Sequence, residues 1–139
     1  MDFKLELVVV PVADVDVAKD FYVDKCGFNL DVDHRGGDDF RVVQMTPPGS
    51  ACSITCLKPA PATPGSLQGL HLIVTDIEAA RAVLTERGVP VGDYYHFGPT
   101  GQTDGLAPDR GDYETFLSFA DPDGNGWVVQ EVGYASANA

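Results

Sequence analysis

Two stretches of the sequence follow one pattern: VADVDVAKDFY at residues 12–22 and VTDIEAARAVL at residues 74–84. In each stretch a strand-like apolar run ends just before an Asp, and apolar residues at helical spacing follow. Asp14 and Asp76, which lie 62 residues apart, stand where helix N-caps are expected, because an Asp carboxylate accepts the free N–H groups of a first turn. Each stretch therefore predicts a strand followed by a helix.

The correspondence between the two stretches continues beyond the helices. Gly88 lies 61 residues after Gly27, and each of these glycines follows a predicted helix as its stop. Gly124 lies 75 residues after Gly49, which aligns the turn DPDGN with the turn TPPGS. A nearly constant offset across strand, cap, helix and stop indicates an internal repeat.

The remaining strand-like runs complete two matching sets. They cover residues 4–12, 28–33, 40–45 and 51–57 in the first half, and 69–76, 89–95, 114–120 and 126–132 in the second. The predicted helices bury Val15, Ala18, Phe21 and Tyr22 in the first half, and Ile77, Ala80, Val83 and Leu84 in the second. We predict one α+β domain over residues 1–139, with βαβββ modules at 4–58 and 67–133 joined by a Pro-rich linker at 59–66.

A single helix covers only one face of a four-stranded sheet. The helix-free faces of two such modules can form a curved mixed sheet around a cleft, within one chain or across a dimer. We therefore expect function on the strand faces opposite the helices.

Composition and charge exclude several classes of function. Nine Lys plus Arg against 21 Asp plus Glu give a net charge of −12, which argues against nucleic acid or an anionic membrane as the partner. No apolar run reaches the roughly 18 residues of a membrane helix, and Glu6 interrupts the N-terminal apolar run, so we expect no signal peptide. Three cysteines without a CxxC motif favour reduced thiols and a cytoplasmic protein.

These motifs resemble the vicinal oxygen chelate superfamily, which includes glyoxalase I, bleomycin resistance proteins, fosfomycin resistance enzymes and extradiol dioxygenases. The resemblance rests on VADVDVAKDFY with the GF that follows it, on VTDIEAARAVL with RGV, and on DPDGN, and it covers about residues 5–132. It implies the glyoxalase/bleomycin resistance/dioxygenase fold. The superfamily hosts many chemistries, so the resemblance does not define a reaction.

Metalloenzymes of that superfamily place His, Gln or Glu ligands on the first and last strands of each half. The resemblance puts these positions at Leu7 and Gly69, and at Ser53 and Val128. None of the four residues is a strong ligand, whereas a transition metal needs three or four His or carboxylate donors. We therefore expect no metal and no other cofactor.

An alternative, shifted site is conceivable around His71. His71 and Gln130 each lie two residues beyond an empty ligand position, so strand alternation puts both on the pocket-facing side, with Glu131 pointing the other way. His96, in the aromatic sequence YYHFG, could join them. The simpler interpretation is that His71 is a half-buried, hydrogen-bonded histidine and that His96 is exposed to solvent.

The segment at residues 96–114, HFGPTGQTDGLAPDRGDYE, has no apolar period and is interpreted as a long loop, either a binding loop and lid or a floppy insertion. Arg110 is its only cation, and it could pair with an anionic ligand or with the nearby Asp109 and Asp112. Phe97 and Tyr113 are further candidate ligand contacts. Trp127 is expected to pack in the core, and DPDGN to form a tight turn rather than a calcium site.

Two functions from different classes follow. The first is a metal-independent protein that binds or sequesters a small molecule, cationic or aromatic, as bleomycin resistance proteins do; the second is a glyoxalase-like lyase, isomerase or dioxygenase with His71 as its candidate catalytic residue. The candidate ligand contacts are Leu7, Ser53, His71, His96, Phe97, Arg110, Tyr113, Val128 and Gln130. The resemblance also implies a homodimer.

Overall fold

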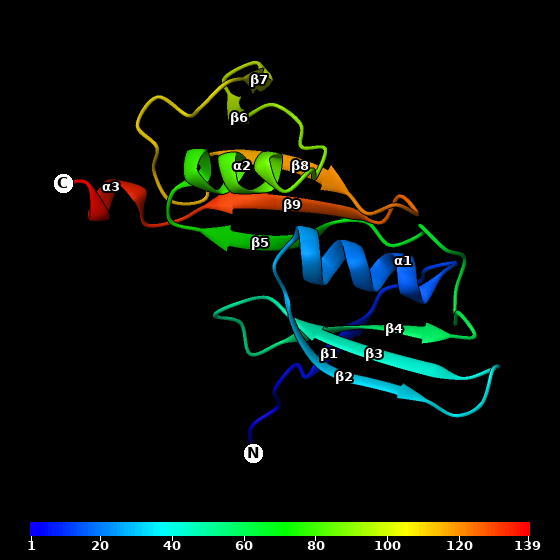
Figure 1. The fold of residues 1–139 in the computed structure, drawn as a ribbon. Coiled ribbons are helices and arrows are strands. Elements are labelled where there is room, and N and C mark those ends of the chain that lie inside the picture. Colours follow the sequence, from blue (N-terminus) through cyan, green and yellow to red (C-terminus); the bar gives the residue numbers. More distant parts are fainter. The chain divides into compact units, whose positions relative to one another are not determined.

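The computed structural model describes residues 1–139, and its strands form two separate sheets of four and five strands (Figure 1). The chain divides into unit 1, made of Met1–Gln68 and Asp121–Asn125, and unit 2, made of Gly69–Ala120 and Gly126–Ala139. Each unit carries a sheet with a helix on it, which confirms the α+β class. No helix is both long and apolar enough to span a membrane.

Unit 1 contains one mixed sheet and one helical segment. Its elements are β1 (Leu7–Val9), α1 (Val15–Lys19), the π-helical turn η1 (Asp20–Lys25), β2 (Asn29–Arg35), β3 (Arg41–Thr46) and β4 (Ser53–Lys58). The strand order is β1-β4-β3-β2, with β1 parallel to β4 and the other pairs antiparallel. The first strand is shorter than the predicted 4–12 at both ends, and at its C-terminal end Pro11 has no N–H to donate to a ladder.

The core of unit 1 forms between the helix and one face of the sheet. The predicted helical stripe of Val15, Ala18, Phe21 and Tyr22 is buried, against Val43, Met45, Ile54 and Cys56 from β3 and β4. Asp14 caps the helix by accepting the N–H groups of Asp16 and Val17. Burial of each large apolar side chain contributes about 1.5–3 kcal/mol. Burial also raises the pKa of the Cys56 thiol to about 12.

The turn at residues 121–125 packs within unit 1. The Tyr22 hydroxyl donates to Asp121 over 2.7 Å, and the Asn125 side-chain amide donates to Asp121 and to the carbonyl of Pro11, each over 2.8 Å. Asp121 also accepts the backbone N–H groups of Asp123 and Asn125. The tight turn predicted for DPDGN is therefore present, and its carboxylate oxygens serve hydrogen bonds inside the protein.

Unit 2 has a related order of elements. They are β5 (Leu70–Val74), α2 (Ile77–Glu86), β6 (Tyr95–Gly98), β7 (Gly101–Asp104), β8 (Phe116–Ala120), β9 (Gly126–Glu131) and the short α3 (Tyr134–Ala137). The strand order is β5-β9-β8-β6-β7, with β5 parallel to β9. Asp76 caps α2 as Asp14 caps α1.

One face of the unit 2 sheet is buried beneath α2. Trp127, Val129 and Leu117 are at most 3% exposed, and Phe119 stacks on Trp127 with the ring centroids 6.0 Å apart. The core position predicted for Trp127 is thus confirmed. The predicted stripe on α2 is wrong at Val83, which is 43% exposed, because only the Ile77 end of this helix is fully buried.

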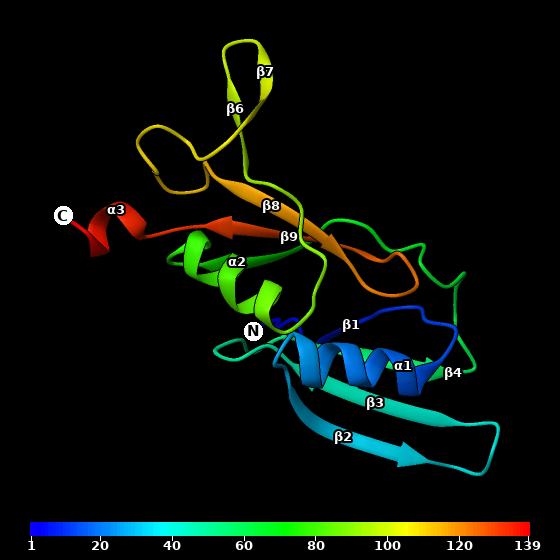
Figure 2. The ribbon, with the colours of Figure 1, turned by 45° about the horizontal axis from the view of Figure 1, so that its top comes forward.

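Two predicted segments differ from the structure. The run at 89–95 was expected to be a strand, but only a single bridge joins Val91 to Phe119 before β6 begins at Tyr95. Part of the expected loop at 96–114 is instead a hairpin of β6 and β7, which extends away from β8 (Figure 2). The polar strand Gly101–Asp104 has no apolar period, so nothing in its sequence favours a strand over a loop.

Candidate functional site

The helix-free face of unit 2 is formed by alternate residues of its strands. Val128 and Gln130 point away from the core, because their neighbours on β9 are the buried ones. His71 lies opposite Val128, and Ile73 lies opposite Gln130, on the adjacent strand β5. His71 and Ile73 are exposed, so this edge of the face is open.

Aromatic side chains cover the other edge of the same face. Phe116 of β8 lies opposite Gln130, and its ring stacks on Tyr95 with the centroids 5.4 Å apart. Phe97 meets both rings edge-on, at 5.6 Å from Phe116 and 6.1 Å from Tyr95. Phe97 is 63% exposed. An aromatic cluster with an exposed member offers an apolar surface on which a flat ligand can stack.

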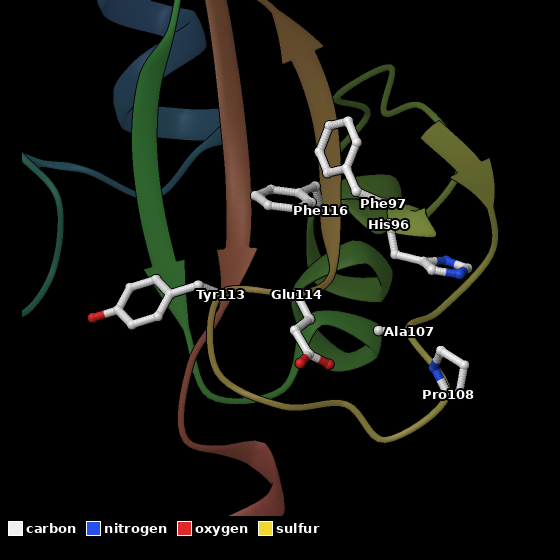
Figure 3. Close-up of a pocket in the computed structure, with 7 residues that line it drawn as sticks. All are labelled: His96, Phe97, Ala107, Pro108, Tyr113, Glu114 and Phe116. Atoms are coloured by element: carbon white, nitrogen blue, oxygen red, sulfur yellow. The ribbon is translucent and has the colours of Figure 1, made fainter. Parts of the chain in front are cut away.

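A pocket of about 240 Å³ opens beside this aromatic cluster. It is lined by His96, Phe97, Ala107, Pro108, Tyr113, Glu114 and Phe116. These residues come from β6, from the loop at 105–115 and from the start of β8. In Figure 3 the side chains of His96, Pro108 and Glu114 surround Ala107, whereas the Tyr113 ring points away from them, past β9.

Two hydrogen-bond acceptors stand on the pocket wall. Nδ1 of His96 lies 2.8 Å from the carbonyl of Gly105, which can only accept, so we assign the ring hydrogen to Nδ1 and leave Nε2 as an acceptor in the neutral ring. Oε2 of Glu114 accepts the N–H of Gly111 over 3.2 Å, which leaves Oε1 for a donor group of a ligand. The pocket therefore combines aromatic surface with a carboxylate and an imidazole nitrogen.

Arg110 does not line this pocket. Its guanidinium binds the two oxygens of Glu131 at 3.0 and 2.6 Å, and it reaches Glu78 at 2.6 Å and Asp76 at 3.4 Å. The Tyr134 ring stacks on it, with 3.3 Å between the guanidinium carbon and the ring centroid. The hydrogen bond to Glu131 raises the pKa of Arg110 above its usual value. The only cation of the loop is thus engaged by carboxylates of the protein.

Glu131 is the important residue that the sequence did not single out as a site residue. It is fully buried, and besides Arg110 it binds the N–H of Ile77 at the start of α2 over 2.8 Å. The strand alternation did predict that Glu131 faces away from Gln130. A signal for its role was present: one Arg in an acidic loop needs a partner, and a Glu on a buried strand face needs a cation.

Leu7 and Ser53, the candidates of unit 1, lie opposite each other on β1 and β4. Ser53 is buried and bonds to Gln44 over 3.1 Å and to Thr46 over 2.7 Å, and Thr46 also bonds to Asp31. This group makes a small polar network on the helix-free face of the first sheet.

The four positions that the resemblance assigned to metal ligands do not fit a metal. Leu7 and Val128 have no donor atom in their side chains, and Gly69, just before β5, has no side chain at all. Ser53 offers only a hydroxyl, which already bonds to Gln44 and Thr46. The pairing register places His71, two residues beyond Gly69, opposite Val128. The donor set of a transition-metal site is therefore absent at these positions.

The structure does not assemble the alternative site of His71, His96 and Gln130 either. Nδ1 of His71 binds the carbonyl of Gly69 at 2.7 Å, His96 binds Gly105, and Gln130 donates to the carbonyl of Tyr113 over 3.4 Å. No group of three or more His, Cys, Asp or Glu side chains is placed to hold a metal ion.

Each of the two units combines a mixed β-sheet with a helix on one of its faces. The chain belongs to the Glyoxalase/Bleomycin resistance protein/Dioxygenase superfamily, whose family model matches residues 4–129. No curated protein sequence matches the chain.

Several solved structures are similar over nearly the whole chain. TnmS3, an antibiotic binding protein from Streptomyces sp. CB03234, is 36% identical with a TM-score of 0.73, and the match covers 94% of this chain and 97% of that one. A glyoxalase/bleomycin resistance protein from the same organism is 36% identical with a TM-score of 0.70, covering 92% and 100%. A superfamily member from Sphaerobacter thermophilus DSM 20745 is 30% identical with a TM-score of 0.71, covering 94% and 98%.

Proposed function

We propose that this protein binds a small aromatic molecule that carries a positive charge or a hydrogen-bond donor, and that it does so without a metal or other cofactor. The observation that carries the proposal is the pocket beside Phe97 and Phe116, with Glu114 and His96 on its wall. Its biological role would be drug binding or sequestration in the cytoplasm. Its similarity to an antibiotic binding protein of 36% identity supports this role.

The chemistry of the pocket favours a cation or a donor over an anion. The free oxygen of Glu114 attracts an ammonium group, and aromatic rings stabilise a nearby cation by about 0.5–2 kcal/mol. Arg110, the nearest basic residue of the loop, is held by three carboxylates. A net charge of −12 adds a long-range field that speeds the approach of cations.

The size of the pocket indicates how much of a ligand it holds. Sites for drug-sized ligands occupy about 300–1,000 Å³, whereas this pocket measures about 240 Å³. A larger ligand would therefore place one ring in the pocket and extend over the exposed edge that carries His71, Val128 and Gln130. Leu7 and Ser53 remain candidate contacts of unit 1, and a homodimer remains part of the proposal.

A titration followed by amide chemical shifts tests the proposal. Adding 1-naphthylmethylamine to ¹⁵N-labelled protein should shift the amides of residues 96–98 and 107–116 most strongly, in saturable curves. A Glu114→Gln variant should bind about tenfold more weakly, because a charge-assisted contact becomes a neutral one. Shifts confined to other segments, or none at all at millimolar probe, would overturn the proposal.

A further inference from the structure

The loop at residues 105–115 supplies four of the seven residues that line the pocket: Ala107, Pro108, Tyr113 and Glu114. It has no regular secondary structure, so its shape depends on individual contacts. The only two non-glycine residues of the chain with positive φ lie in it, Arg110 at +46° and Tyr113 at +64°. Such backbone is strained and persists only where neighbouring contacts hold it.

Those contacts converge on Glu131. The buried carboxylate of Glu131 takes a bidentate contact from the Arg110 side chain, and its backbone carbonyl accepts the N–H of Tyr113 over 2.9 Å. Both strained residues of the loop are therefore tied to one residue of β9. The Tyr134 ring covers the guanidinium, whose side chain is only 12% exposed.

The strained backbone at Arg110 also determines where Glu114 lies. Gly111, which follows Arg110, donates its N–H to the Glu114 carboxylate over 3.2 Å, and the Glu114 N–H donates to the Gly111 carbonyl over 3.3 Å. A Cβ on Gly111 would lie 2.9 Å from the same carboxylate, so a larger residue at this position would displace the Glu114 side chain. The orientation of the pocket carboxylate thus depends on the backbone at Arg110 and Gly111.

We propose that Arg110 is a positioning residue for ligand binding: by pairing with Glu131 it fixes the turn that aims the Glu114 carboxylate into the pocket. Arg110 then acts on the ligand only through Glu114. This inference rests on the proposed function. A direct contact between Arg110 and an anionic ligand would have a different effect. In that case loss of Arg110 would weaken the binding of anions and not of cations.

A double-mutant cycle separates positioning from a general structural role. The affinity for 1-naphthylmethylamine is measured for the wild type, Arg110→Met, Glu114→Gln and the double variant. We expect each single change to weaken binding about tenfold, and the double variant to bind no more weakly than Glu114→Gln alone. Additive losses, or unchanged affinity in Arg110→Met, would overturn the inference.

Two further variants test whether a weaker affinity comes only from an unpaired buried charge or from the loss of any arginine. Arg110→Met leaves the buried Glu131 charge unpaired, so Arg110→Met/Glu131→Gln, which removes both charges and keeps an acceptor for the Ile77 N–H, is measured beside it and should show the same loss of affinity. Arg81→Met is the matched control. Arg81 also lies over a ring, that of Tyr94, and pairs with a carboxylate, that of Asp93, but it lines no part of the pocket. It should leave the affinity unchanged.

Hydrogen exchange measures how well the amides of the loop are protected when no ligand is present. The hydrogen-bonded amides of Arg110, Gly111, Tyr113 and Glu114 should exchange at least tenfold faster in Arg110→Met/Glu131→Gln than in the wild type, while those of β3 and β4 keep their rates. Unchanged exchange in the loop would overturn the inference, whatever the probe does. If the wild type binds no probe while the loop exchange accelerates, the proposed function fails and the ordering of the loop by Arg110 stands.

Discussion

Glu131 is fully buried, and its two carboxylate oxygens hold the Arg110 guanidinium at 3.0 and 2.6 Å. The pair joins β9 to the loop that forms the pocket, and the same carboxylate accepts the first N–H of α2. A single side chain thereby connects the sheet, the helix and the loop of unit 2. Breaking such a pair is costly because the remaining charge stays in a dry environment.

Replacing Glu131 by Ala should therefore lower the free energy of unfolding by about 3–5 kcal/mol. Glu131→Gln should cost less, because it can still accept the N–H of Ile77. Urea unfolding followed by Trp127 fluorescence measures both, with the exposed Glu86→Ala as a control that stays within about 0.5 kcal/mol of the wild type. A loss below about 1 kcal/mol for Glu131→Ala would contradict this account of the pair.

Substitutions at two glycines with the same backbone conformation distinguish the cost of a steric clash from the cost of backbone strain. Gly65 has φ +83° and a Cβ placed there would lie 2.1 Å from the carbonyl oxygen of Asp123, whereas Gly49 has φ +84° and nothing within 4 Å. Gly49→Ala should cost about 1–2 kcal/mol from strain alone. Gly65→Ala should cost at least about 2 kcal/mol more, because the linker must move away from the turn at 121–125. Equal losses in thermal unfolding would show that the linker does not pack against that turn.

An ion-pair cluster in unit 1 should make stability depend on acid pH. Hydrogen bonds from Arg41 and Lys19 hold the pKa of Asp33 well below its usual value. A carboxylate with a lowered folded-state pKa stabilises the protein above its unfolded pKa of about 4, and this contribution is lost as the pH falls toward the folded-state value. Asp33→Asn should therefore reduce Tm at pH 6, and its difference in Tm from the wild type should narrow steadily as the pH falls from about 5 to about 2. A constant difference in Tm over this range would contradict the assignment.

The exposed aromatic ring at the pocket should matter for binding and not for folding. Phe97→Ala should weaken binding of 1-naphthylmethylamine by about 1 kcal/mol, roughly fivefold, through loss of ring stacking. Its Tm should stay close to that of the wild type, because the side chain is 63% exposed. Phe40→Ala, at an exposed ring of unit 1, is the matched control and should change neither the affinity nor Tm appreciably. A large loss of Tm in Phe97→Ala would show that Phe97 is a packing residue.

The sequence predicted the parts of the fold that local patterns determine. Asp14 and Asp76 cap their helices, and Gly27 and Gly88 follow the helices at positive φ, as the repeat indicated. These signals are readable because a cap or a helix stop needs particular residue types at one position. The alternation on β9, with Trp127 buried, was equally local.

Features that depend on tertiary contacts could not be predicted from the sequence. The polar strand β7 is held only by its pairing with β6, so its residues carry no strand signal. Glu114 was not predicted as a site residue, because the sequence around it has no pattern that distinguishes a pocket carboxylate from an exposed one. Arg110 stands out in the sequence as the only cation of its segment, but its partner Glu131 is 21 residues away in the chain, and only the fold brings the two together.

Calorimetry tests most directly whether an aromatic cation binds this protein without a metal. Wild-type protein is titrated with 1-naphthylmethylamine and, separately, with 2-naphthoate, first in chelator and then after incubation with nickel, iron, zinc or manganese. We expect saturable binding of the amine in chelator, at least about tenfold tighter than binding of the carboxylate, and unchanged by any metal. Binding that appears only with a metal, or that favours the carboxylate, would contradict it.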